Sequence, residues 1–209
     1  MSVTISVKKY SVLLPALYLI SSCAVFNQTY TVSERTEEYL FAPAWTDQRK
    51  AYRVDSSAEA KKYLYFVSSA ENAKKRPCLK ESEKSAMQKA ADDTADDLLH
   101  RMKEEKKKNN KVHISPTLKD RLKSNILVNL YDIDIAGEYW EKRKYSKEKG
   151  ADKNYTAYKC DTVIKIPKTN MIDAVKTSAE KVSQTMKHNT RKAMEAAAAS
   201  YAVAVNIEN

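Results

Sequence analysis

The chain has 209 residues, of which 43% are hydrophobic and 31% are charged, as in one folded domain with a tail at one or both ends. Only two residues are glycine, which argues against nucleotide-binding folds, because their phosphate loops need several glycines. The formal net charge of +10 would favour a nucleic-acid partner in the cytosol, but the export signal at the start of the chain argues against one.

Residues 1–22 have the organisation of an export signal. Lys8 and Lys9 form a cationic start, and a short apolar run over 12–20 follows. The run is about half as long as the roughly 20 apolar residues that a spanning helix needs. It therefore predicts a cleaved signal peptide over 1–22, after which the chain keeps a formal charge of +8.

The end of this segment, Ile20-Ser21-Ser22-Cys23, resembles the lipobox of bacterial lipoprotein signal peptides, with isoleucine where the family prefers leucine. The resemblance implies cleavage after Ser22 and attachment of diacylglycerol and an N-acyl chain to Cys23, with no other cofactor. An ordinary secretory signal with an incidental cysteine is the alternative. By resemblance to enterobacterial sorting rules, Ala24 implies the outer membrane, with the domain in the periplasm.

Residues 23–61 are predicted to be the lipidated cysteine and a tether, because they are polar and lack sustained periodicity. The later part of this tether is expected to pack Trp45 on the domain, which is predicted to span 62–205. Residues 63–67, four of which are aromatic or β-branched, predict a strand that ends in a turn at Ser68-Ser69.

Two helices are predicted next. Apolar residues at helical spacing predict a helix from about Ser82, its expected N-cap, to about Glu105. A charged linker over 106–111 follows. Ser115-Pro116 predicts the start of a second helix, whose buried face is expected to carry Leu118, Leu122 and Ile126.

The pattern then changes to period two. It predicts a strand over about 131–140, with Gly137 at a bulge, and after a basic loop over 141–154 another strand over 155–166, ended by Pro167. Asn170 is the expected N-cap of a last long helix that reaches about residue 205. The predicted class is α+β, in the order β-α-α-β-β-α, with a sheet of three or more strands and helices on one face.

Cys78 and Cys160 remain if Cys23 is lipidated. Two thiols in an oxidising compartment can form a disulfide, here across 82 residues. Cys160 can equally be a small buried hydrophobe of its strand. A metal site is not expected, because the two cysteines are not in a paired knuckle and no histidine stands near either.

The order of elements resembles the LPP-twenty type of bacterial envelope lipoproteins, which includes lipoproteins of flagellar basal discs. The residues that carry the resemblance are Cys23 after the signal peptide, Pro43-Ala44-Trp45, the strand and turn over 63–70, the alanine-rich helix, and the late strands with Tyr139-Trp140 and Tyr158. Serine replaces the family's usual glycine at Ser68, and 103–111 looks like an insertion. The resemblance implies a structural or adhesive role, without enzymatic activity and often as an oligomer.

No catalytic constellation is visible in the sequence. The cluster of Asp92, Asp93, Asp96 and Asp97 is expected to be a solvated helix face, because nothing supplies the convergent ligands of a calcium site. His100, His113 and His188 are scattered without metal-ligand spacing.

Two functions remain open. The first is a membrane-anchored structural lipoprotein that self-associates or docks on an envelope complex, for which the C-terminal alanine run would allow close helix packing. The alternative is a binding module for anionic envelope polysaccharide or lipopolysaccharide, which the positive charge and the 13 tyrosines favour.

Overall fold

The computed structural model describes residues 28–207, so the predicted signal peptide, Ser22 and Cys23 lie outside the described part. The elements in chain order are β1 (Tyr30–Arg35), the 3-10 helices η1 (Ala44–Thr46) and η2 (Gln48–Val54), α1 (Ser57–Ala60), β2 (Tyr63–Asn72), α2 (Lys75–Lys108), α3 (Leu118–Asn129), β3 (Asp134–Tyr145), the 3-10 helix η3 (Lys147–Lys149), β4 (Tyr155–Pro167), α4 (Lys168–Ser183) and α5 (His188–Ile207).

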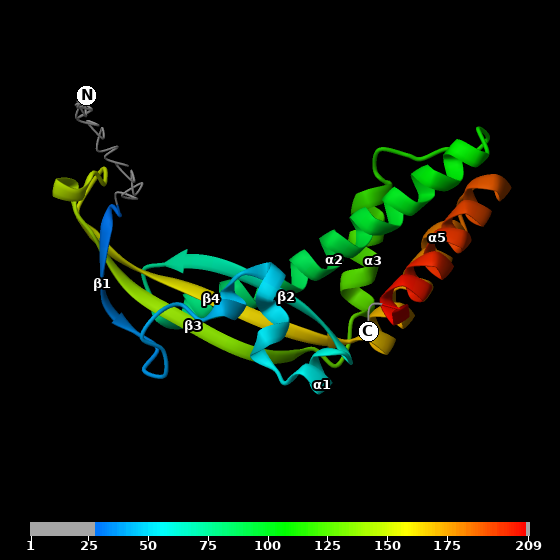
Figure 1. Ribbon diagram of the computed structural model, residues 1–209. Helices are drawn as coiled ribbons and strands as arrows, with labels where there is room; N and C mark the ends of the chain where they lie inside the picture. Colours follow the sequence, from blue (N-terminus) through cyan, green and yellow to red (C-terminus); the bar gives the residue numbers. More distant parts are fainter. Residues whose placement is uncertain (1–27, 208–209) are drawn as a thin grey trace, which may run out of the picture.

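The strands form one antiparallel sheet in the order β1-β3-β4-β2. This arrangement confirms the predicted α+β class. β3 and β4 form a long hairpin, and one end of it projects well beyond the helices, which gather at the other end (Figure 1). Among the described helices, none is both long enough and apolar enough to cross a membrane.

The larger core lies between the sheet and the helices. Alternate residues of β4, including Ile164 and Ile166, point into it, as period-two strand geometry requires. The helices contribute fully or almost fully buried residues: Ala90, Leu98, Met102, Leu118, Leu122, Ile126, Met171, Val175, Met194, Ala197 and Ala198. The alanine run of α5 therefore packs partly inside the chain, where α5 contacts α2 and α4.

A second, smaller core covers part of the opposite face. Trp45 is 4% exposed and packs on Tyr65, Tyr139 and Val163, so its predicted packing on the domain is confirmed. Gly137 lies at the bulge of β3, where the register against β4 shifts. A Cβ atom there would lie 3.1 Å from the Trp45 ring, so glycine is what lets the indole approach the sheet.

The segment 30–61 departs from the sequence prediction of a tether. Tyr30–Arg35 forms β1, which pairs with β3, and the two 3-10 helices cover the sheet. A six-residue strand with one apolar aliphatic side chain, Val32, has too weak a pattern to be recognised before its partner is known. The folded part therefore includes residues 30–61, ahead of the predicted start at 62.

Several predicted boundaries were also wrong. α2 begins at Lys75, and Ser82 is buried inside it, where its hydroxyl contacts the Leu79 carbonyl and the Thr162 hydroxyl. β3 continues through the predicted loop to Tyr145. Asn170 lies in the first turn of α4, where its amide donates to Asp132 instead of capping the helix. The last helix is two helices, because the chain breaks after Ser183.

The two edges of the sheet differ. The Gln48 side chain binds the outer edge of β2, where its amide donates to the Tyr65 carbonyl at 2.8 Å and accepts from the Val67 N–H at 2.9 Å. These are the positions that a neighbouring strand would use. β1 forms the other edge of the sheet.

Candidate functional site

The candidate site begins where the first turn of α2 contacts the sheet, and it includes the part of the sheet that extends past the helices (Figure 1). We call it the projecting end and define it as β1, residues 139–145 of β3, the loop 146–154 and residues 155–161 of β4. Its two faces carry different side chains, because successive residues of a strand point to opposite sides. The face that also carries Trp45 holds two carboxylate networks and three tyrosines.

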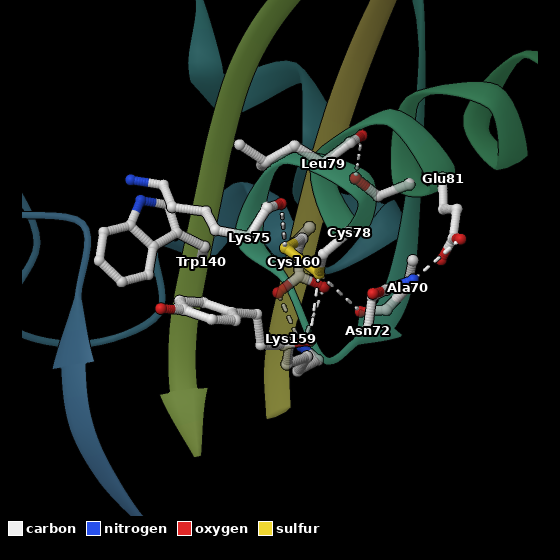
Figure 2. Close-up of a disulfide and its surroundings, with 12 residues drawn as sticks. Ala70, Asn72, Lys75, Cys78, Leu79, Glu81, Trp140, Lys159 and Cys160 are labelled. Atoms are coloured by element: carbon white, nitrogen blue, oxygen red, sulfur yellow. Dashed lines mark hydrogen bonds and ion pairs between the residues drawn. A yellow bond between two sulfur atoms is a disulfide. The ribbon is translucent and has the colours of Figure 1, made fainter. Parts of the chain in front are cut away.

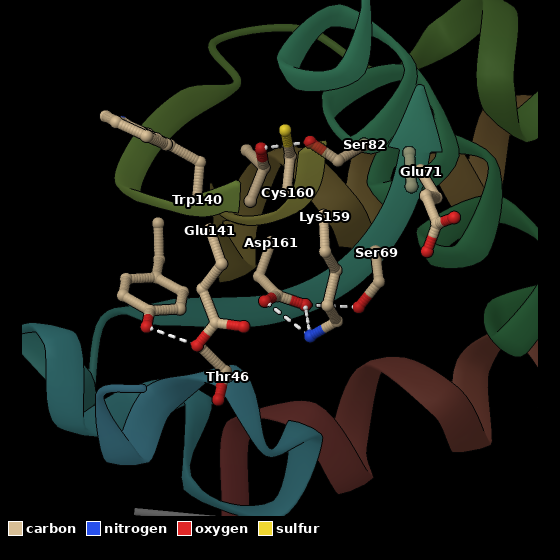
Figure 3. A network of polar contacts seen from close by, with 12 residues as sticks. Thr46, Ser69, Glu71, Ser82, Trp140, Glu141, Lys159, Cys160 and Asp161 are labelled. Carbon is tan, nitrogen blue, oxygen red and sulfur yellow. Dashed lines mark hydrogen bonds and ion pairs between the residues drawn. The ribbon is translucent and has the colours of Figure 1, made fainter. Parts of the chain in front are cut away.

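The first network is centred on Asp161, whose side chain is 1% exposed. Lys159 donates to both carboxylate oxygens, at 2.9 and 2.7 Å, and the Ser69 hydroxyl donates to one of them (Figure 3). Ser69 lies directly opposite Asp161 in the β2–β4 register. A buried carboxylate is tolerated here because a cation and a hydroxyl replace its hydration.

The second network is centred on Glu141, which is 8% exposed. The Tyr139 hydroxyl donates to one oxygen at 2.7 Å, and Arg143 donates to the other through two nitrogens at 3.0 and 2.9 Å. Burial alone would raise the pKa of Glu141, but the bonds from Tyr139 and Arg143 outweigh it and hold this pKa below its usual value. Burial and the bond to Glu141 raise the pKa of Tyr139.

In both networks the carboxylate oxygens are hydrogen-bonded by groups of the protein itself. Each carboxylate is bound by a cation from a neighbouring position of its own strand and by a hydroxyl donor. Such paired, hydrogen-bonded groups fix the strand register and the orientation of the cations. We therefore infer that the two networks have a structural role and hold the surrounding side chains in place.

Three tyrosines lie next to these networks, toward the tip. Tyr145 stacks on Tyr155 with ring centroids 4.3 Å apart and lies 5.4 Å from Tyr30, while the Arg143 guanidinium lies 4.1 Å from the Tyr30 ring centre. The Tyr145 hydroxyl donates to Glu71 at 2.6 Å. Burial and this bond raise the pKa of Tyr145 to about 12, so its ring is neutral at physiological pH. The arrangement offers flat aromatic surface beside fixed positive charge.

The opposite face of the projecting end carries another aromatic and cationic group. The Trp140 and Tyr158 rings lie 5.9 Å apart, and the Lys75 ammonium lies 3.8 Å from the Trp140 ring centre (Figure 2). Lys142 forms an ion pair with Glu34 of β1 at 2.7 Å. Both faces of this end therefore combine aromatic rings with cations.

The disulfide lies at the base of this second group. Cys78 of α2 and Cys160 of β4 are bonded, and their Cα atoms are 5.8 Å apart (Figure 2). Both residues are 0% exposed. The bond joins the first turn of α2 to the middle of the sheet, so it fixes the helical layer to the strands that project from it.

The other residues singled out in the sequence lie elsewhere. Asp92 pairs with Lys119 and Lys123, and its three neighbouring aspartates each pair with a cation of α2 or α3. Bonds from these lysines lower the pKa of Asp92 against the opposing effect of burial. Across residues 28–207 no cluster of three or more histidine, cysteine or acidic groups is placed to hold a metal, and the three histidines do not converge.

Sequence reasoning missed Ser69, Glu141, Lys159 and Asp161 as members of the site. A lysine and an aspartate two residues apart in a strand share one face, which is a usable signal. Their pairing with Ser69 depends on a strand register that joins positions 92 residues apart. No family model matches the chain, and no curated protein matches it.

Proposed function

We propose that the protein is a lipid-anchored lipoprotein of the bacterial envelope, of the LPP-twenty type, with a structural and self-assembling role. In this proposal lipid on Cys23 holds it to the outer membrane, the folded domain lies in the periplasm, and no reaction is catalysed. The motif Ile20-Ser21-Ser22-Cys23 after an apolar run supports the anchor.

The observation that carries the self-assembling role is the loop after β1. Leu40 and Phe41 are 83% and 80% exposed. Behind them, Tyr39 packs edge-on against Trp45 and Tyr139, with ring centroids 6.4 and 6.0 Å apart. The loop is therefore fixed from inside while it presents two large apolar side chains to solvent, a pattern typical of contact sites between proteins.

The strand next to this loop adds a second means of contact. β1 is an edge strand of the sheet, and pairing at such an edge is a common way for two copies to join. Burial of Leu40 and Phe41 on a partner would contribute about 1.5–3 kcal/mol for each side chain.

The test uses the full lipidated chain purified in detergent. We expect wild-type protein to sediment as an oligomer and the double variant Leu40→Ser/Phe41→Ser to dissociate at least tenfold more readily. Val128→Ser is the matched control, because Val128 is 77% exposed on α3, away from the loop. A wild type that stays monomeric, or a double variant that associates like the wild type, would refute self-assembly.

The aromatic and cationic surface supports a second candidate, binding of anionic envelope polysaccharide or lipopolysaccharide. Tyr30, Tyr145 and Tyr155 supply ring faces, and Arg143 lies beside them. A contact driven by charge weakens steeply with salt, whereas apolar assembly does not. Retention on immobilised polysaccharide at rising salt therefore separates this function from assembly through Leu40 and Phe41.

A further inference from the structure

The β3–β4 hairpin ends in a lysine-rich turn. We define the hairpin tip as residues 144–155. It carries four exposed lysines, Lys144, Lys147, Lys149 and Lys153, against two acids, Glu148 and Asp152. Within residues 28–207 none of these four lysines forms an ion pair. Their charge is therefore available to an external anion.

The tip is also well ordered by its own hydrogen bonds. The Lys147 N–H donates to the Asn154 side chain at 2.8 Å, and the Ser146 hydroxyl accepts from the Glu148 N–H at 3.3 Å. Gly150 has a φ of 89°, which closes the turn in a conformation that glycine adopts without strain. The lysines are thus held on a defined turn.

The start of the described chain lies against this tip. The Ser146 N–H donates to the Thr29 carbonyl at 3.1 Å, and Tyr30 pairs with Tyr145. Cys23 stands only five positions before Gln28 in the sequence. Five residues span at most about 18 Å, so a lipid on Cys23 brings the tip close to the membrane surface whatever path those residues take.

The tip has the chemistry of a membrane-surface contact. Lysines attract anionic headgroups over about 8 Å at physiological salt, and tyrosines favour the boundary between lipid and water. Tyr30, Tyr145 and Tyr155 lie at the base of the tip. The helices lie at the opposite end of the molecule (Figure 1).

We infer that the hairpin tip rests on the anionic phospholipid headgroups of the leaflet that holds the anchor, with the helical layer directed away from the membrane. This inference depends on the proposed lipid anchor. The short connection favours lipid over polysaccharide as the occupant, because an anchored chain keeps the headgroups at high effective concentration beside the tip. The Leu40–Phe41 loop follows the far end of β1 and remains free for a second copy.

The test measures lysine reactivity in the native lipidated protein. The protein is incorporated into vesicles of phosphatidylcholine alone or with phosphatidylglycerol, and its lysines are methylated with formaldehyde and cyanoborohydride under single-hit conditions. Mass spectrometry then gives the rate at each lysine and shows whether Cys23 carries lipid. Lys187 and Lys192 are matched controls, because both are exposed and lie at the helical end.

The expected result is methylation about fivefold slower at the four tip lysines on phosphatidylglycerol vesicles, with the control lysines unchanged. The difference should disappear in 1 M salt. Equal tip rates on both vesicles, with lipid present on Cys23, would overturn the inference and leave the anchor intact. Protection by soluble anionic polysaccharide but not by vesicles would also overturn it. An unlipidated Cys23 would instead refute the proposed function, and the inference with it.

Discussion

The disulfide between Cys78 and Cys160 provides the sharpest test of how the domain is held together. It closes a loop of 82 residues that contains most of α2 and all of α3 and β3. In the chain-entropy description a loop of this length stabilises the folded state by about 4.5 kcal/mol. Domains of this size are stable by only about 5–15 kcal/mol in total, so loss of the bond should leave the fold close to its limit.

The assay is urea unfolding followed by circular dichroism on three samples. These are the oxidised wild type, the wild type refolded in reductant, and the double variant Cys78→Ala/Cys160→Ala. With a denaturant slope of about 2 kcal/mol/M, the midpoint should fall by about 2 M on reduction. The variant should fall slightly further, because two sulfur atoms leave the buried interior.

The kinetics of reduction provide an independent check. Both cysteines are fully buried, so a reductant reaches the bond only when the structure opens. Reduction under native conditions should therefore be slow and should accelerate with urea. A reduced wild type whose midpoint lies within about 0.5 M of the oxidised protein would refute the assigned role of the bond.

Two further predictions concern the sheet. Gly137→Ala should lower the free energy of unfolding by about 1–3 kcal/mol, because the new Cβ would lie 3.1 Å from both the Trp45 ring and the Val54 side chain. A simultaneous Trp45→Ala change should remove part of this penalty in a double-mutant cycle. The pKa of Glu141 is lowered in the folded state, so its ionised carboxylate stabilises the fold at pH values above its unfolded pKa of about 4.3. This stabilisation is lost as the pH falls through the folded pKa. The melting temperature should therefore fall less between pH 7 and pH 3 in Glu141→Gln than in the wild type. An equal fall in both proteins would contradict the assigned role of the Glu141 network.

Local patterns predicted the elements that bury a continuous stripe or face. The strand over 155–166 and the face with Leu118, Leu122 and Ile126 are both present, because their periodicity is strong enough to read without a partner. The bulge at Gly137 could also be predicted, since an isolated glycine inside a strand pattern typically marks a bulge or a close approach to the backbone.

Features that depend on a distant partner could not be predicted. β1 is recognisable only through its register with β3, more than 100 residues later. Ser82 has the composition of an N-cap, but Thr162 binds it in the core. Glu141 stood in the predicted basic loop, but pairing with β1 and β4 extends the strand through it. In each case a partner distant in the sequence decides the local structure.

The side chain of Gln48 has a consequence for how copies of this molecule can join. It occupies the Tyr65 carbonyl and the Val67 N–H on one border of the sheet, so a strand from another molecule cannot form hydrogen bonds with these two groups. Within residues 28–207, the other border, formed by β1, remains open to strand addition. If two copies join by strand addition through β1 alone, the pair is two-fold symmetric and has no further open edge, so it does not grow into a fibre.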